Sequence, residues 1–228
     1  MRLGYPCLCM DIRHSALFDL THPTVSRTIL MWIKVGRVAG VWLAPPCTSW
    51  SAACRPAVRS RSYLFGLPSV PAHRAESLKT GNDTHHFVIK IVSLCVRLRV
   101  PCAVENPDTS LFWLTPQMQH HLRRSAVYRF CFCAFGTKWR KATKVAAWNF
   151  AIPGLANKMC TKGKGVCQYS GRRHTVLKGR DPVSGRNKTS LAAAYPHRFA
   201  SVVAAAFVDQ CRDPVTTTST LICTAKPV

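Results

Sequence analysis

The sequence predicts an α/β fold in which helices cover both faces of a doubly wound, mostly parallel sheet of the Rossmann-like type. A continuous apolar run over 38–44 and a second run over 102–107, which ends in polar residues, have the length and composition of parallel strands that are buried on both faces. Patterns with the helical spacing of apolar residues alternate with these runs, as is typical of doubly wound sheets. The chain has 228 residues, which is enough for one such domain with a small appendage.

The N-terminal elements follow from short apolar runs and the residues that bound them. Residues 5–11 and 16–20 are predicted to be strands, because each run is apolar and ends in or near an aspartate. A helix follows, capped by Thr21 and ended by Gly36, with its apolar residues on one face. The apolar strand over 38–44 comes next.

The middle of the chain contains a segment without periodicity. Residues 48–82 are rich in Ser, Pro, Arg and Gly, which predicts a long mobile loop, and such loops in compact domains are usually functional. An amphipathic pattern predicts a helix over 83–99, which Pro101 ends before the second buried strand. The remaining predicted elements of the core are a short helix over 109–123 and strands over 126–135 and 142–149.

Composition divides the chain into four parts. The α/β core extends over 1–149, and a small basic, Gly-rich module with Cys and His residues occupies 150–187. We expect residues 188–212 to contain the closing helix of the core. The Thr-rich tail, 213–228, is expected to be disordered.

The charge balance indicates a polyanionic partner. The chain has 32 Lys and Arg against 9 Asp and Glu, a formal net charge of +23, and no acidic residue lies between Asp108 and Asp181. Such a surface favours nucleic acid, DNA in the first place, over small acidic molecules. No apolar run is long enough for a membrane span or a secretory signal, so we expect a soluble intracellular protein, found with nucleic acid in a nucleus or nucleoid. Its cysteines are then thiols, metal ligands or a nucleophile rather than disulfides.

Side chains with useful chemistry fall at the predicted carboxyl ends of strands, the edge at which open α/β sheets bind ligands. They include Asp11 and Asp19. Cys47 follows two prolines at the end of one strand, and Glu105 precedes Asn106 at the end of the next, so a nucleophilic thiol and a general acid are expected side by side. A buried structural cysteine, and a carboxylate that caps the following helix, are the alternatives.

The Pro45-Pro46-Cys47 and Glu105-Asn106 motifs resemble those of the cytosine-5 DNA methyltransferase family. In that family the Cys adds to carbon-6 of a cytosine flipped out of the duplex, and the Glu hydrogen-bonds and protonates the ring at N3. Carbon-5 then takes a methyl group from S-adenosylmethionine. The resemblance covers the core and the closing helix, and it implies a DNA cytosine-5 methyltransferase with Cys47, Glu105 and Asn106 in its catalytic site.

The resemblance also implies a site for S-adenosylmethionine. Family members bind the cofactor ribose by an acidic residue after the second strand and the adenine by an Asp after the third, places that Asp11 and Asp19 match, with Pro45 as a third contact. A solvated turn aspartate is the alternative at both positions. The family's first strand and its Phe-x-Gly-x-Gly loop, which holds the methionine part of the cofactor, have no counterpart in this sequence. We therefore expect an N-terminally truncated or degenerate copy with weak cofactor binding.

Basic residues of two segments are expected to contact nucleic acid. The loop over 48–82 would close on the phosphates of DNA with an extruded base, and its arginines would favour the Cys47 thiolate. The segment 135–143 resembles divergent mobile-element or phage-like members and stands where the family has a Gln-x-Arg-x-Arg strand, so Arg140 joins the catalytic residues. A solvated basic turn is the alternative there. The predicted nucleic-acid contacts are Ser51, Arg55, Arg59, Arg61, Lys138 and Lys141.

Cysteine and histidine spacing in the basic module indicates a candidate zinc site. Six residues separate Cys160 from Cys167, six more separate Cys167 from His174, and Cys133 lies upstream. Four such ligands form tetrahedral zinc sites, and a metal would let this segment fold although it has few apolar residues. Unliganded thiols are the alternative, because no Cys-x2-Cys knuckle is present.

Two functions of different classes follow from these patterns. The first is an S-adenosylmethionine-dependent enzyme that methylates cytosine in DNA. The second is a non-catalytic basic nucleic-acid-binding domain derived from a methyltransferase. The missing glycine-rich loop favours the second, and charge alone does not distinguish RNA from DNA as the partner.

Overall fold

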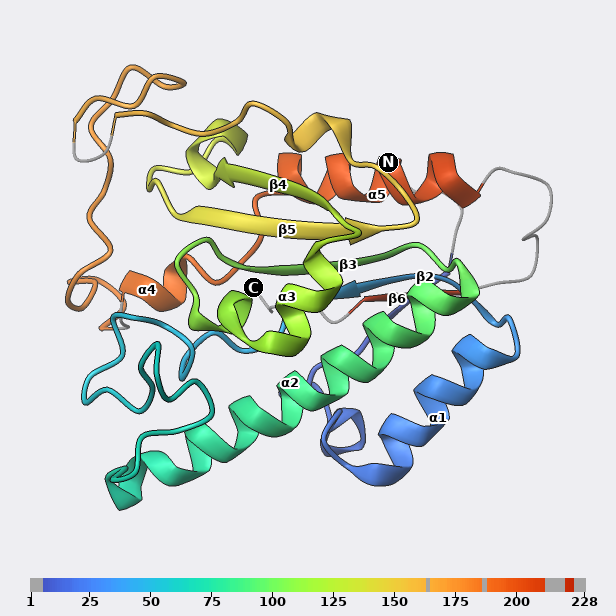
Figure 1. Cartoon of the computed structure of the whole chain (residues 1–228). Coiled ribbons are helices and arrows are strands. Elements are labelled where there is room, and N and C mark those ends of the chain that lie inside the picture. Colours follow the sequence, from blue (N-terminus) through green and yellow to red (C-terminus); the bar gives the residue numbers. More distant parts are fainter. Residues whose placement is uncertain (1–5, 163–164, 186–187, 212–219, 224–228) are drawn as a thin grey trace.

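The computed structural model describes residues 6–162, 165–185, 188–211 and 220–223, which form an α/β fold around one mixed sheet (Figure 1). The strand order is β1-β6-β2-β3-β5-β4. The pairings from β1 to β3 are parallel, and β5 pairs antiparallel with both β3 and β4. The strands are β1 (Cys7–Cys9), β2 (Val38–Leu43), β3 (Cys102–Pro107), β4 (Ala126–Cys131), β5 (Ala142–Trp148) and β6 (Thr220–Cys223).

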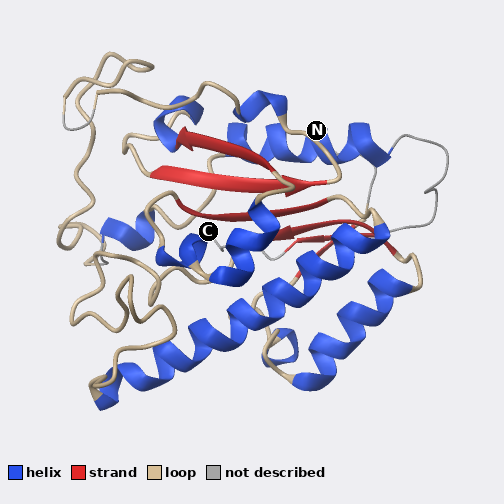
Figure 2. Ribbon diagram, viewed as in Figure 1, coloured by secondary structure: helices blue, strands red, loops and turns tan. Residues whose placement is uncertain are grey.

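Helices cover both faces of the sheet. Helices α1, α2 and α3 pack on one face, and α5 packs on the other (Figures 1 and 2). The α-helices are α1 (Pro23–Lys34), α2 (Ala72–Leu98), α3 (Pro116–Leu122), α4 (Lys188–Leu191) and α5 (His197–Cys211). Short 3-10 helices are η1 (Ala16–Phe18), η2 (Leu111–Leu114), η3 (Phe132–Phe135) and η4 (Pro153–Leu155).

Alternation along the central strands produces two hydrophobic cores. In β2, Val41 and Leu43 belong to the core beneath α1 and α2, whereas Trp42 between them belongs to the core beneath α5. In β3, Val104 and Ala103 divide between the two cores in the same way. Because both faces are covered, every residue of β2 is buried, which accounts for the continuous apolar run in the sequence.

The predicted α/β fold is confirmed, and the sheet is mixed, because β5 runs opposite to the other strands. The strands predicted over 126–135 and 142–149 form the antiparallel pair β4 and β5. Their connection, over 132–141, contains only η3 and is too short for a parallel crossover, which needs a dozen or more residues and usually a full helix.

The strand predicted over 16–20 is wrong, because this run forms η1. The Ser15 hydroxyl accepts a hydrogen bond from the Leu17 N–H at 3.2 Å, so a polar side chain starts a helical turn here and overrides the apolar pattern. The next helix, α1, begins at Pro23, and the His22 side chain caps it in place of the predicted Thr21.

The loop predicted over 48–82 is wrong from Ala72 onward, where α2 already begins. A glycine within an apolar pattern favours a loop in a sequence-based prediction. Gly81 nevertheless lies inside α2, because the close packing of the loop after β2 leaves no room for a side chain there. A Cβ at Gly81 would collide with the Ser49 hydroxyl and come within 2.7 Å of Arg59 Nη2. The shorter loop that remains is anchored, because its Trp50 is buried.

The disordered tail predicted over 213–228 is wrong for Thr220–Cys223, which form β6. The remaining tail residues lie outside the described part of the chain. Strand β6 pairs parallel with β1 on one side and with β2 on the other, so it lies between these two strands in the sheet. Its β-branched residues suit a strand, but only the neighbouring strands make that propensity decisive.

The basic module contains little regular structure of its own. Ile152 and Leu155, at its start, join the core beneath α5. Farther along, isolated bridges pair Lys158 with Phe130, and Val166 with Arg173. None of the helices in the described residues is long and apolar enough to cross a membrane.

Candidate functional site

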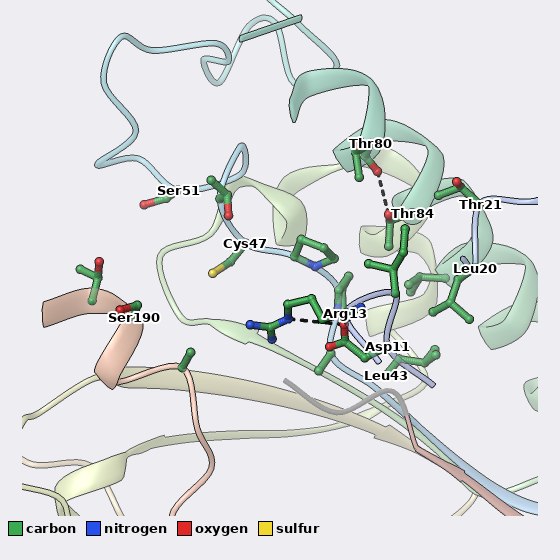
Figure 3. Close-up of a pocket in the computed structure, with 18 of the residues that line it drawn as sticks. Asp11, Arg13, Leu20, Thr21, Leu43, Cys47, Ser51, Thr80, Thr84 and Ser190 are labelled. Atoms are coloured by element: carbon green, nitrogen blue, oxygen red, sulfur yellow. Dashed lines mark hydrogen bonds and ion pairs between the residues drawn. The ribbon is translucent and has the colours of Figure 1, made fainter. Parts of the chain in front are cut away.

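A cavity of about 790 Å³ opens at the carboxyl ends of β1 and β2, within the range of roughly 300–1,000 Å³ that ligand pockets occupy. Residues from the N-terminal turn, the loop after β2, helix α2 and the segment around α4 line it (Figure 3). The predicted site residues among them are Asp11, Asp19, Pro45, Cys47, Ser51 and Lys141.

Cys47 is partly exposed and follows Pro45 and Pro46 directly after β2. Its sulfur points into the open space of the cavity, as does the guanidinium of Arg13 (Figure 3). Sequence reasoning missed Arg13, although its place two residues after Asp11 was a usable signal.

The two aspartates of the cavity already accept local hydrogen bonds. The Asp11 carboxylate accepts from the Arg13 N–H at 2.9 Å and forms an ion pair with its guanidinium at 3.4 Å. The Asp19 carboxylate accepts from the Thr21 hydroxyl at 2.7 Å and from the Thr21 N–H at 2.9 Å. The hydroxyl hydrogen bond from Thr21 is the main cause that lowers the Asp19 pKa below its ordinary value. Both carboxylates thus hold turns as well as lining the cavity.

The ends of β2 and β3 at the predicted catalytic site are joined by Asn106. Its side-chain amide donates a hydrogen bond of 3.0 Å to the Pro45 carbonyl, which fixes the turn that carries Cys47. Glu105 is fully buried, and its carboxylate accepts a hydrogen bond of 2.8 Å from the Tyr195 hydroxyl. In the described structure Glu105 does not line the cavity with Cys47.

Tyr195 is a site residue that sequence reasoning missed. Its hydroxyl also accepts a hydrogen bond of 3.2 Å from the Trp42 indole, so it bridges β2 and β3 at their carboxyl ends. Ala192 and Ala193, in the same turn between α4 and α5, line the cavity. The turn therefore contacts both the Glu105 carboxylate and the Cys47 cavity.

The predicted contact of Arg59 with nucleic acid is wrong. This side chain is only 5% exposed, and its guanidinium stacks on the Trp50 ring at 3.5 Å from the centroid. It also donates hydrogen bonds to groups of the loop and α2, among them the Ser49 carbonyl at 3.1 Å. Burial lowers the pKa of Arg59 to about 10. Arg59 therefore organises the loop after β2 from inside.

The other predicted contacts in this loop remain on the surface. Arg61 is exposed, and Arg55 is exposed while donating to the Ala52 carbonyl at 3.0 Å and the Cys54 carbonyl at 2.8 Å. Neither of the two arginines lines the cavity as the structure describes it. Both are free to meet a polyanion, but neither supplies the cation that faces Cys47.

The basic residues of the turn before β5 lie in different environments, and of Lys138, Arg140 and Lys141 only Lys141 lines the cavity. Lys141 lines the cavity, where its ammonium donates to the Ala192 carbonyl at 2.8 Å. Arg140 donates to the Cys160 carbonyl at 3.1 Å and is not among the residues that line the cavity, so its catalytic role stays a prediction. Lys138 is exposed, and its carbonyl accepts from the Thr175 N–H at 2.8 Å.

The predicted metal ligands do come together. One donor atom from each of Cys133, Cys160, Cys167 and His174 lies within 4.8 Å of the others, and the three cysteines are buried. Burial raises the Cys167 pKa, but hydrogen bonds from the N–H groups of Tyr169 and Ser170 and from the Ser170 hydroxyl, among others, outweigh it and bring that pKa to about 6. This Cys3His group can hold a metal ion.

Comparison with models of protein families, with curated proteins and with solved structures finds no match to this chain. The geometry of the two sites is therefore the basis for inference.

Proposed function

We propose that the chain is a cytosine-5 DNA methyltransferase-like protein with Cys47 as its nucleophile. The observation that carries the proposal is that Cys47 opens, partly exposed, into a cavity at the carboxyl ends of parallel strands that Asp11 and Asp19 also line. In this proposal the fold is Rossmann-like and doubly wound, and β6 stands in the place of the family's first strand beside β1.

The first chemical step is addition of the thiolate to the base. Cys47 sulfur forms a bond with carbon-6 of an extruded cytosine, and the electron pair of the carbon-5–carbon-6 double bond moves into the ring. Protonation at N3 by Glu105 makes carbon-5 nucleophilic. S-adenosylmethionine supplies the methyl group when bound. Loss of the carbon-5 proton and cleavage of the sulfur–carbon-6 bond return the thiolate.

The residues present fit part of that cofactor. Asp11 and Asp19 offer carboxylates to a ribose and an amino group, since both line the cavity. The sequence contains no Phe-x-Gly-x-Gly loop to cradle a methionine group by its backbone. Glu105 reaches a base in the cavity only if the turn that carries Tyr195 moves away, so the proposal includes displacement of this turn when DNA binds.

Covalent trapping tests the proposal. A duplex with 5-fluorocytosine holds the thiol adduct after methyl transfer, because the fluorine at carbon-5 cannot leave as a proton. We expect a denaturation-resistant adduct that maps to the peptide with Cys47 and is lost in Cys47→Ala. The matched control is Cys54→Ala, which removes the other cavity thiol and should retain the adduct. An adduct at Cys54 would overturn the assignment of the nucleophile.

The alternative is a non-catalytic nucleic-acid-binding domain, which two observations favour. The Glu105 carboxylate lies under Tyr195 rather than in the cavity, and the glycine-rich cofactor loop is missing from the sequence. Calorimetric titration with S-adenosylmethionine separates the two functions. Affinity in the low micromolar range favours the enzyme, and no measurable heat together with tight DNA binding favours the binding domain.

A further inference from the structure

The Cys3His group lies apart from the Cys47 cavity and is built from three separate pieces of chain. Cys133 is in η3, directly after β4, and Cys160 follows the bridge that joins Lys158 to β4. Cys167 and His174 flank a tight hairpin. Donor atoms from these three pieces of chain thus face one point beside the edge strand of the sheet.

The hairpin that carries two of the donors has the hydrogen bonds of a closed turn. The Cys167 N–H donates to the Arg172 carbonyl at 2.7 Å, and the Gly171 N–H donates to the Cys167 carbonyl at 2.9 Å. Gly171 has a φ of +65°, which a glycine adopts without strain. This turn folds the chain back so that Cys167 and His174 face the same point.

The four donor atoms lie near the spacing that a tetrahedral zinc ion requires. Zinc bonds of about 2.3 Å to sulfur and about 2.0 Å to nitrogen place neighbouring ligand atoms about 3.5–3.8 Å apart. All four donor atoms lie within 4.8 Å of one another, and Cys160 Sγ is 3.8 Å from His174 Nε2. Small side-chain shifts bring the remaining pairs to the bonded spacing.

The surroundings of these thiols do not make an ordinary hydrophobic core. The buried cluster consists of Cys131, Cys133, Cys160 and Cys167, and the partly buried apolar residues that pack against it in the described part of the chain are Ala142 and Met159. Thiols bury little apolar area, so their burial alone stabilises this segment weakly. A metal bound by deprotonated sulfur supplies the missing stabilisation, as it does in small domains with few apolar residues.

We propose that Cys133, Cys160, Cys167 and His174 bind one Zn²⁺ in a closed, structural site that fastens residues 158–162 and 165–175 to the edge of the sheet. Four protein ligands leave no open position for substrate, which distinguishes this site from a catalytic one. Binding converts three thiols to thiolates and releases up to three protons, so that the zinc–thiolate group carries a net charge of −1. The neighbouring Arg140, bonded to the Cys160 carbonyl, favours that charge.

The site also bears on the cavity. Thr175, next to His174, is bonded to the Lys138 carbonyl at 2.8 Å, and Leu177 lines the Cys47 cavity. A zinc ion bound here would hold the segment that leads to Leu177 in the cavity wall, and it would take no part in chemistry there. This inference does not depend on the function proposed for Cys47.

Metal analysis of the full chain, purified without tag or chelator, tests the proposal. We expect about one zinc per chain, and intense visible bands of a tetrahedral cobalt–thiolate site after exchange with Co²⁺. Cys167→Ser should lose the metal, whereas Cys131→Ser should keep it, because Cys131 belongs to the same buried cluster but not to the ligand set. His174→Cys preserves a donor and should retain zinc where His174→Ala does not.

Three outcomes would overturn the zinc site. They are zinc near zero in the wild-type chain with a thermal midpoint that chelator leaves unchanged, equal metal loss in Cys131→Ser and Cys167→Ser, or full zinc in His174→Ala. The wild-type measurement decides even if a variant fails to fold. Failure of these tests leaves the Cys47 assignment untouched, because trapping of 5-fluorocytosine is read at a different residue.

Discussion

Replacement of Arg59 by methionine should destabilise the protein by about 3–5 kcal/mol, because it leaves several buried acceptors without a donor. The guanidinium donates to the Leu64 carbonyl at 2.6 Å, the Asn82 side chain at 2.7 Å and the Leu78 carbonyl at 3.2 Å, in addition to the carbonyl and hydroxyl of Ser49. Each buried acceptor left without a partner costs about 1–3 kcal/mol. The recovered desolvation of the guanidinium offsets part of that sum.

Denaturation in urea, followed by circular dichroism, measures this change as a shift of the transition midpoint. The matched control is Arg61→Met in the same loop, which is exposed and should change stability by less than about 0.5 kcal/mol. If Arg59→Met cost under about 1 kcal/mol and weakened DNA binding instead, the buried network would be refuted. The sequence-based assignment of Arg59 to nucleic acid would then stand.

Two further predictions concern pH and salt. His85 is fully buried and contacts the Thr115 hydroxyl at 2.9 Å, and burial, with His86 and Arg59 nearby, lowers its pKa to about 4. The unfolded chain therefore binds the extra proton between about pH 6.5 and pH 4, so stability should fall by up to about 3 kcal/mol across this window as pH decreases. His85→Gln should flatten that loss in denaturation midpoints, and an unchanged slope would contradict it. Because the net charge is +23, DNA binding should weaken as the salt concentration rises. The logarithm of the affinity, measured by fluorescence anisotropy, should fall against the logarithm of the salt concentration with a slope of about −0.9 per phosphate contact. An affinity that does not change with salt would exclude an interface dominated by phosphate contacts.

The parts of the fold that the sequence predicted are those in which burial is repeated along the chain. Strands β2 and β3 are covered on both faces, so β2 is an unbroken apolar run and β3 begins with three apolar residues. Strand β6 was not predicted, because a short Thr-rich segment becomes a strand only when it pairs with two neighbouring strands. The early start of α2 was not predicted, because a glycine at position 81 favours a loop. Only the structure shows that Arg59 packs close to this glycine.

In the candidate site, too, some residues were predicted from the sequence and others were not. Cys47 and Asp11 were predicted together because the carboxyl ends of strands meet at one edge of a sheet. Asp19 also lines the cavity, but from the end of η1 rather than from the strand that the sequence predicted. The Cys3His set was found from spacing, because few other patterns bring three thiols and an imidazole together. Tyr195 and the buried state of Arg59 depend on contacts between distant segments, which neither charge nor periodicity records.

Exchange of the hydrogen at carbon-5 of cytosine tests the central claim about Cys47 most directly, because it requires thiol addition but no cofactor. Reversible attack at carbon-6 makes carbon-5 exchange its hydrogen with solvent. The protein should therefore release tritium from DNA labelled at carbon-5 of cytosine, and Cys47→Ala should reduce that release to background while Cys54→Ala does not. Release that persists in Cys47→Ala, or no release by the wild-type chain bound to the same DNA, would contradict Cys47 as the nucleophile.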